Sequence, residues 1–413
     1  MQYLLFAKNT FYQFISRVAS SFIGFLITII IAKYFGVFGY GEFTKITSYV
    51  ALFYLILDFG LNAIYLNLER KDFKTFFYLR ILISAILFLV LNLISSTFPY
   101  NSISQSGFSE LTKIGILIFS LSLFSQSLIL SSIAIFQKNE SYSYYAKGII
   151  IGSLVNLCFV FIFSFLNFSI FYVLISFVAT GLLTGLIHIK DTKEKITPFL
   201  FDKQYAKKIF ILSMPIGLML IFNLVYFRAD IFLLSLMSTT KSVGLYGLSY
   251  KFFDFIIAIP LFMSNSIYPL LIKYKNTEGD FKKIVGKYFL IFFSLSFIFI
   301  VLFWFASPLF SFIREDFSDA IFPFRILLLS LPFFFTTSFF QWVLITKDKQ
   351  KFLMYIYFIL LIINILLNIY LIPKYSYFAS AWITVFSEGI VFIVLAIKTI
   401  RVLNYTRMGS KND

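Results

Sequence analysis

Long apolar runs separated by short polar connections extend over almost the whole chain. Runs long enough to cross a membrane lie at about 11–32, 46–66, 76–98, 114–135, 147–167 and 169–189, and then at about 209–237, 244–272, 284–306, 321–346, 352–372 and 377–399. Only helices and closed barrels satisfy their backbone hydrogen bonds in lipid, and continuous runs of this length favour helices. The pattern therefore predicts an all-α polytopic membrane protein with twelve transmembrane helices.

The basic residues between the runs predict an orientation. With the N-terminus placed in the cytoplasm, most lysines and arginines fall in the inner connections, and the outer connections hold only Lys33, Lys45, Lys113, Lys241, Arg314 and Lys374. Basic residues are retained on the cytoplasmic side of a membrane. Both termini are therefore expected in the cytoplasm, and the first span is expected to remain as an uncleaved signal.

The polar connection near the middle of the chain suggests a division into two halves. We expect an N-terminal six-helix bundle at 1–189, a cytoplasmic linker at 190–208, a C-terminal six-helix bundle at 209–401 and a polar cytoplasmic tail at 402–413. The linker is amphipathic and rich in lysine. It is expected either to lie on the membrane surface or to be a solvated connection.

An internal repeat supports this division. Val37-Phe38-Gly39-Tyr40-Gly41 opens the second run, and Val243-Gly244-Leu245-Tyr246-Gly247 opens the eighth; the same offset places Lys45 on Lys251. Six crossings are an even number, so both halves would have the same orientation. They are expected to be related by a pseudo-two-fold axis along the membrane normal, as in transporters that alternate access by rocking.

Composition narrows the classes of protein and of site. Hydrophobic residues make up 60% of the chain and charged residues 13%, which excludes a soluble domain of this length. The net charge of +16 could indicate nucleic acid, but lysines confined to connections indicate topology instead. The single Cys158 excludes disulfides and cysteine metal sites within the chain, and the single His188 is expected at the membrane interface.

Four charges interrupt the two runs at the centre of the sequence. Arg228 and Asp230 lie in the first run, and Lys251 and Asp254 in the second. Charges inside membrane helices are costly, so they usually face a partner, a cavity or a substrate path. One interpretation is a clasp that pairs Arg228 with Asp254 or Asp230 with Lys251. The other is that Arg228 and Lys251 line a cavity and bind phosphate.

Five further charges lie within the runs or at their edges. Arg17 and Asp58 can form a second clasp in the inner half of the membrane. Arg80 and Arg325 lie near span ends, where they either snorkel or contact substrate. Glu388 lies near the middle of its run without a basic neighbour in its own helix, which indicates ion coupling or a hydrogen-bonded neutral acid. Asp58, Asp230 and Asp254 are additional candidates for coupling or gating.

Short motifs are distributed over the whole chain. The first are Arg17, Gly36, Tyr40-Gly41 and Asp58-Phe59-Gly60-Leu61. The central ones are Phe227-Arg228-Ala229-Asp230, Val243-Gly244-x-Tyr246, Lys251, Pro260 and Ile267-x-Pro269. The last are Asn368, Ile372-Pro373-Lys374-Tyr375, Ala379-Ser380-Ala381, Thr384 and Glu388. Together these motifs resemble those of the polysaccharide-transporter family, within the multidrug/oligosaccharidyl-lipid/polysaccharide exporter superfamily.

This resemblance implies a flippase with two six-helix bundles around a cationic central cavity. Such a protein moves undecaprenyl-pyrophosphate-linked oligosaccharide repeats of the O-antigen or capsule type to the outer leaflet of the bacterial cytoplasmic membrane. The expected partners are the lipid-linked oligosaccharide, membrane lipids and other polysaccharide-assembly proteins. The expected substrate-binding residues are Arg17, Arg80, Arg228, Lys251 and Arg325.

Two alternatives compete with this function. An ion-coupled exporter of small molecules would favour an acidic pocket over a basic one. A membrane-embedded polymerase or ligase would carry catalytic groups on a sizeable outer loop, but the outer connections are short, and the sequence has no metal cluster, nucleophile elbow or phosphate-cradling loop. We therefore expect a transporter without catalytic residues or cofactors, driven downhill or by a proton or sodium gradient.

The first prediction concerns topology. In a Cys158→Ser background, cysteines introduced into 67–75, 190–208, 273–287 and 347–351 are expected to react with a thiol reagent only when it reaches the cytoplasm. A cysteine at Arg314 in an outer connection is the control and should be labelled from outside. External labelling of any of the four inner segments would contradict the twelve-helix assignment.

Overall fold

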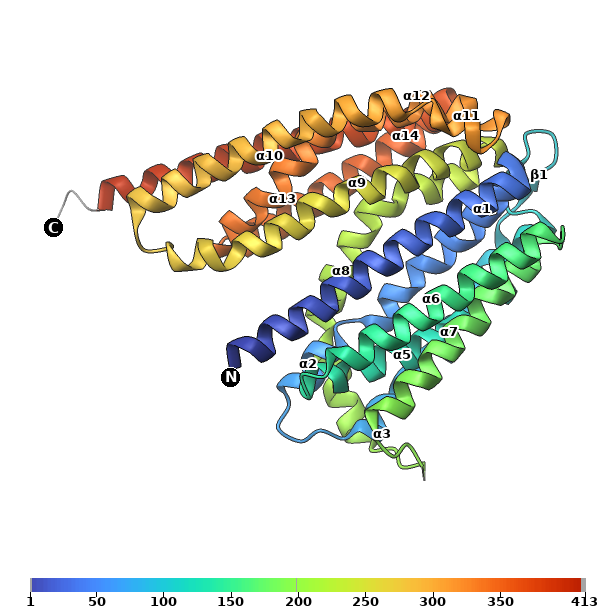
Figure 1. Ribbon diagram of the computed structural model, residues 1–413, viewed down its shortest axis with the longest axis horizontal. Helices are drawn as coiled ribbons and strands as arrows, with labels where there is room; N and C mark the ends of the chain where they lie inside the picture. The colour runs from blue at the N-terminus through green and yellow to red at the C-terminus, as the bar shows by residue number, and fades with distance from the viewer. Residues whose placement is uncertain (1, 198, 410–413) are drawn as a thin grey trace. The chain divides into compact units, whose positions relative to one another are not determined.

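The computed structural model describes residues 2–197 and 199–409 as two compact units (Figure 1). Unit 1 contains the residues up to Arg228 and the short segment Thr239–Gly244. Unit 2 contains Ala229–Ser238 and the residues from Leu245 onward. Each unit is treated separately below.

Unit 1 is built almost entirely from helices. Its elements are α1 (Gln2–Asp58), α2 (Leu61–Asn67), α3 (Phe73–Thr97), β1 (Tyr100–Asn101), β2 (Ser106–Gly107), α4 (Glu110–Ser120), α5 (Ser122–Lys138), α6 (Tyr142–Phe165), α7 (Ile170–Thr192) and α8 (Lys203–Met237) as far as Arg228. Helix α1 packs against α6 and α4, and α5 packs against α7 and α3. The antiparallel pair β1–β2 was not predicted from the sequence.

Helix α1 covers two of the predicted apolar runs and is interrupted between them. Gly36 has φ 65° and ψ −174°, a backbone conformation that side chains with a Cβ rarely adopt. In Figure 1 the darker and lighter blue parts of α1 meet at the end of unit 1 that carries the strands. The glycine thus provides the break that the polar connection between these runs predicted.

Two glycines allow α1 and the first turn of α9 (Thr240–Lys273) to cross in backbone contact within unit 1. A Cβ atom at Gly41 would lie 2.2 Å from the carbonyl oxygen of Thr240, and a Cβ atom at Gly244 would lie 2.2 Å from that of Val37. Any side chain would therefore separate the two backbones. Val37, Gly41 and Gly244 belong to the two segments that the sequence repeat matches.

The connection between α7 and α8 is held against α3. The Arg70 guanidinium pairs with the Asp202 carboxylate at 2.9 Å, and the Tyr78 hydroxyl donates to the carbonyl of Ile196 at 3.0 Å. The backbone N–H of Tyr205 and the neighbouring Arg70 hold the pKa of Asp202 below its usual range. These contacts dock the connection on the protein, and its expected position on the membrane surface or as a solvated connection remains a prediction.

The start of α8 also belongs to this part of unit 1. Tyr205, Ala206 and Ile209 are buried in a hydrophobic cluster with side chains of α2 and α3, including Tyr65 and Phe76. Burial of this apolar surface stabilises the attachment. The compact units consequently divide within α8 and near the start of α9, and the expected boundary at 190–208 does not separate them.

Unit 2 contains the end of α8, α9 from Leu245 onward and the remaining helices. These are α10 (Glu278–Ala306), α11 (Leu309–Ile313), the 3₁₀ helix η1 (Glu315–Ala320), α12 (Ile321–Leu328), α13 (Leu331–Thr346) and α14 (Gln350–Gly409). Helix α13 packs against α10 and α14. Helix α14 is interrupted at Ser376, with φ 53° and ψ −136°. The predicted tail thus begins as a continuation of α14, and residues 410–413 lie outside the described part.

The described residues form nine helices that are long and apolar enough to cross a membrane. The number is ten if the bent segment formed by Glu315–Leu328 and Leu331–Thr346 counts as one span. The bend between its two parts is 45°. The chain is therefore an all-helical, multi-pass membrane protein apart from the short strand pair, as the apolar pattern predicted.

Candidate functional site

Arg80 lies at the centre of a buried polar cluster in unit 1. Its guanidinium donates to Asn62 Oδ1 at 2.9 Å and to Ser131 Oγ at 3.4 Å, and lies 3.9 Å from Asp58 Oδ1. The guanidinium also lies over the Phe76 ring, 4.7 Å from its centroid. The Arg80 side chain is fully buried. These contacts hold the ends of α1, α2, α3 and α5 together.

The cluster corrects two expectations. Asp58 pairs with Arg80, whereas an ion pair with Arg17 was expected, and Arg80 is buried, which does not fit the snorkelling alternative. The positive φ angles of Phe59 and Gly60 end α1 and direct the chain into α2, which brings Asn62 to the guanidinium. A buried charge is retained only where a partner and hydrogen bonds compensate its desolvation. A substrate contact by Arg80 would require this cluster to open.

Arg17 differs from Arg80 in its surroundings. Its side chain is exposed on α1, and within the described ranges no carboxylate lies at ion-pair distance from it. It interacts electrostatically with Tyr145 on α6. Its predicted role in receiving phosphate remains a prediction.

Lys45 is a buried charge that sequence analysis assigned to an outer connection. It lies inside α1, and its ammonium donates to Thr240 Oγ1 at 2.7 Å and to the carbonyl of Gly107 at 3.0 Å. Glu42 Oε1 lies 3.8 Å from the same nitrogen. The sequence signal that could have identified this ion pair is the three-residue spacing of Glu42 and Lys45, which places opposite charges on one helix face.

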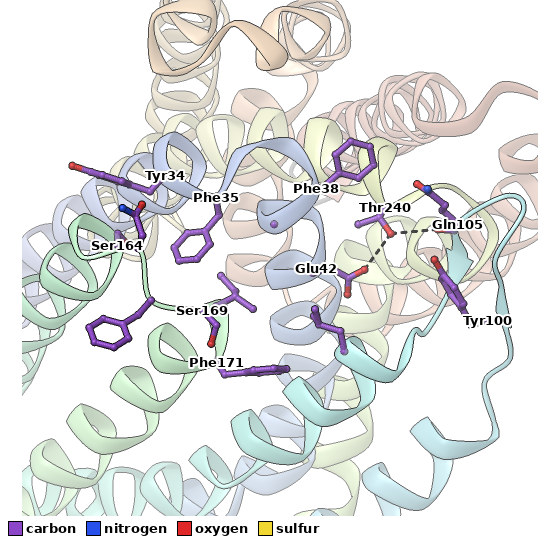
Figure 2. Close-up of a pocket in the computed structure, with 15 residues that line it drawn as sticks. Tyr34, Phe35, Phe38, Glu42, Tyr100, Gln105, Ser164, Ser169, Phe171 and Thr240 are labelled. Atoms are coloured by element: carbon purple, nitrogen blue, oxygen red, sulfur yellow. Dashed lines mark hydrogen bonds between the residues drawn. The ribbon is translucent and has the colours of Figure 1, made fainter.

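A cavity of about 610 Å³ lies beside this cluster, within unit 1. Figure 2 shows that it is bounded by α1 near its break, by the connection between α6 and α7, and by the segment that contains β1. Its aromatic lining consists of Tyr34, Phe35, Phe38, Tyr100, Phe168 and Phe171. We call this space the hairpin cavity. None of its lining residues was predicted as a site residue, because its walls come from distant segments.

Asp230 is buried in unit 2 and is held by two donors. The Tyr246 hydroxyl donates to Asp230 Oδ2, and the backbone N–H of Ile231 donates to Oδ1 at 2.7 Å. Tyr246 also hydrogen-bonds with Thr384 of α14. The carboxylate is thus positioned by its neighbours on α8 and α9.

A row of buried amides and hydroxyls continues along α14. Ser380 Oγ donates to Asn368 Oδ1 at 3.3 Å, and Asn368 Nδ2 donates to Asn364 Oδ1 at 3.0 Å. Asn364 Nδ2 in turn donates to Ser387 Oγ at 3.2 Å. Carboxylate, amide and hydroxyl oxygens are the ligand types that hard cations such as Na⁺ prefer.

Glu388 follows this row and is also buried. It interacts electrostatically with Tyr357, whose hydroxyl accepts a hydrogen bond from Gln341 Nε2. Its carboxylate therefore lies in a polar environment. Among the described residues, no group of three or more His, Cys, Asp or Glu side chains could hold a metal ion.

The remaining predicted site residues lie on α8, α9 and α12. Arg228 and Asp254 are half-buried and Lys251 is exposed; their predicted pairing and substrate contacts remain predictions. Arg325 donates to Ser307 Oγ at 2.9 Å, and its guanidinium lies 4.9 Å from the centroid of the Trp304 ring. Arg325 thus joins the last turn of α12 to the end of α10.

His188 packs inside unit 1, and its expected position at the membrane interface remains a prediction. It is fully buried, its Nε2 lies 3.1 Å from the carbonyl oxygen of Tyr145, and its ring packs edge-on against Phe136. A Cβ atom at Gly148 would lie 2.2 Å from His188 Nε2, so the glycine admits the imidazole between α6 and α7. The histidine is therefore a packing residue.

Comparison with known proteins gives a consistent picture of family and fold. The profile of a family described as polysaccharide biosynthesis proteins matches residues 6–275, and the MatE profile matches residues 215–370. A search of curated proteins found no match.

Solved structures of transporters share the fold. The lipid II flippase MurJ in an inward closed conformation has a TM-score of 0.74 at 18% identity, over 96% of this chain and 89% of that chain. An inward-facing multidrug resistance MATE transporter of the MOP superfamily has a TM-score of 0.69 at 13% identity, over 94% and 96%. The MATE multidrug transporter DinF-BH has a TM-score of 0.62 at 13% identity, over 97% and 96%.

The Arg80 cluster gives a prediction about stability. Arg80→Met should lower the free energy of unfolding by roughly 2–4 kcal/mol, because it leaves the polar groups of Asp58 and Asn62 without their donor. Thermal unfolding of the purified protein in detergent measures this loss. Arg17→Met is the control and should leave the unfolding temperature nearly unchanged. Equal unfolding temperatures for Arg80→Met and Arg17→Met would contradict the structural role.

Proposed function

Because the chain belongs to the polysaccharide biosynthesis protein family, we propose that it is a flippase for a lipid-linked oligosaccharide. Its substrate is an undecaprenyl-pyrophosphate-linked repeat unit of the O-antigen or capsule type. The repeat unit moves from the inner to the outer leaflet of the bacterial cytoplasmic membrane by alternating access. The observation that carries this proposal is the match over residues 6–275 in a chain whose fold resembles that of a lipid II flippase.

The proposed topology has twelve crossings with both termini in the cytoplasm. Among the described residues, nine helices qualify as spans when α1 and α14 are each counted once, and the bent pair of Glu315–Leu328 and Leu331–Thr346 makes ten. The breaks at Gly36 and Ser376 lie between two predicted apolar runs in each long helix. Counting α1 and α14 as two crossings each brings the number to twelve and agrees with the positions of the basic residues.

Basic residues on the membrane helices suit the pyrophosphate of such a substrate. Arginine binds phosphate through two parallel hydrogen bonds, and lysine contributes a compact positive charge. Arg17 and Arg228 are the arginines we assign to this role, together with Lys251 on α9. Arg80 and Arg325 are held by protein groups and are assigned to structure.

An exporter of small molecules is the competing function. The MatE match over residues 215–370 supports it, but this match covers a smaller part of the chain than the polysaccharide biosynthesis match. The two functions differ in substrate. A flippase moves a lipid-linked pyrophosphate, and an exporter would move soluble cations in the same proteoliposomes.

The cationic site gives a prediction about transport. In proteoliposomes with a fluorescent lipid-linked oligosaccharide, Arg228→Ala should lower the flipping rate roughly 10- to 100-fold, the effect of losing a hydrogen bond to a charged group. Arg228→Lys should restore part of the rate because it keeps the charge without the bidentate geometry. Arg314→Ala, in the connection before η1, is the control. Full activity of Arg228→Ala would contradict a role in transport.

Ion coupling gives a second prediction. We propose that a buried carboxylate of unit 2 couples transport to a proton or sodium gradient, with Glu388 and Asp230 as candidates. Glu388→Gln keeps the shape of the side chain but removes its charge, and should lower transport and weaken its dependence on an imposed gradient. Asp230→Asn is the matched variant, because it makes the same change from carboxylate to amide at the other candidate residue.

The comparison of the two variants assigns the coupling site. Loss of gradient dependence in Asp230→Asn alone would assign the coupling site to Asp230, and loss in Glu388→Gln alone would assign it to Glu388. Retained dependence in both variants would exclude both carboxylates. A wild-type protein that is indifferent to either gradient would contradict ion coupling itself.

A further inference from the structure

The hairpin cavity has a lining that fits a sugar better than a phosphate. We propose that it binds an uncharged sugar ring of the oligosaccharide, at the end of unit 1 opposite the N-terminus of α1. This inference rests on the proposed function for the origin of the sugar. The argument for the site itself rests on the size, aromatic walls, polar groups and charge of the cavity.

The size and walls of the cavity suit a ring with two apolar faces. Its volume of about 610 Å³ lies within the ordinary range of small-molecule sites. Figure 2 shows Phe35 and Phe171 on different walls, contributed by α1 and by α7, and Tyr100 at another edge. Aromatic rings offer large rigid faces. The C–H faces of a pyranose can pack on such rings while its hydroxyls remain available at its rim.

A positioned carboxylate lies on the cavity wall. Glu42 accepts a hydrogen bond from Thr240 Oγ1 at 3.2 Å through Oε1 and one from Thr112 Oγ1 through Oε2. These bonds fix the orientation of the carboxylate, and 15% of its side chain remains exposed. A carboxylate has about four acceptor positions. Glu42 can therefore still accept a hydrogen bond from a sugar hydroxyl.

Ser164 provides an independent sign of a ligand. It lines the cavity near the end of α6 and is almost completely buried, with a relative exposure of 1%. In the described part of the chain, its hydroxyl oxygen has no hydrogen-bond partner. A buried hydroxyl without a partner is destabilising, because it has lost water without gaining a hydrogen bond. A ligand hydroxyl in the cavity would supply that partner.

The charge of the lining indicates which part of the substrate the cavity binds. Among the described residues that line the cavity there is no lysine, arginine or histidine. The nearby Lys45 ammonium donates to Thr240 and Gly107 and pairs with Glu42, so its charge is already compensated. An anion in the cavity would meet the Glu42 carboxylate without a free cation. The lining therefore favours an uncharged sugar over pyrophosphate or an anionic lipid headgroup.

Photo-crosslinking can identify the occupant. The full chain, with p-benzoylphenylalanine replacing Phe171, is reconstituted with the lipid-linked oligosaccharide extracted from the native membrane and is irradiated. Mild acid then cleaves the bond between sugar and pyrophosphate, and mass spectrometry shows which part remains attached. Replacement of Tyr172, the exposed neighbour on α7 that does not line the cavity, is the control.

The expected result is a sugar adduct at position 171 that is absent from position 172. A prenyl phosphate or phospholipid adduct at position 171, no adduct there, or equal sugar adducts at both positions would each overturn the inference. The flipping assay on the same proteoliposomes separates this from the proposed function. Normal flipping without a sugar adduct would overturn only the sugar site, and a sugar adduct without flipping would overturn only the flippase function.

Ser164→Ala tests the same site by affinity. Since the hydroxyl has no protein partner, its removal should leave the unfolding temperature unchanged or slightly higher. It should raise the substrate concentration for half-maximal flipping about 3- to 10-fold, the effect of one neutral hydrogen bond. Ser96→Ala, at an exposed serine of α3, should change neither value. An unchanged concentration dependence in Ser164→Ala would contradict the hydrogen bond to sugar.

Discussion

A charge buried inside a membrane protein needs compensating partners, because lipid supplies none, and this constraint organises the polar clusters of unit 1. The fully buried Arg80 lies between Asn62, Ser131 and Asp58, and its desolvation is tolerable only with these contacts. Lys45 satisfies the same requirement through Thr240 and Gly107. In each case one basic side chain joins segments that are distant in the sequence, so the charge acts as a structural link.

Glycine has a complementary role where helices must break or approach closely. Gly36 interrupts α1 with a positive φ, and Gly41 and Gly244 let two backbones come into contact. This close approach brings Thr240 to Lys45 and Glu42, and it also places Thr240 on the wall of the hairpin cavity. The backbone crossing, the buried ion pair and the proposed sugar site thus depend on the same few residues.

The two units place their polar groups differently, which suits a division of functions. Unit 1 contains the buried Arg80 cluster and the aromatic hairpin cavity. Unit 2 contains a row of oxygen groups from Asp230 through α14 to Glu388. The aromatic cavity suits a sugar, and the row of oxygen groups suits a cation. The sugar site and the ion-coupling site are both proposals, and they fall in different units of the chain.

The sequence by itself determined the class of protein, its helical and multi-pass character and the family, because hydrophobic length and short motifs are local properties. It also marked Asp58, Arg80 and Asp230 as unusual, since a charge in an apolar run is visible without a structure. Their partners were decided by tertiary structure. Arg80 was expected either to snorkel or to contact substrate, and Lys45 was placed in a connection, because the groups that compensate them lie up to 195 residues away. The cavity beside Ser164 was equally hidden, since its walls meet only when the break at Gly36 brings distant segments together.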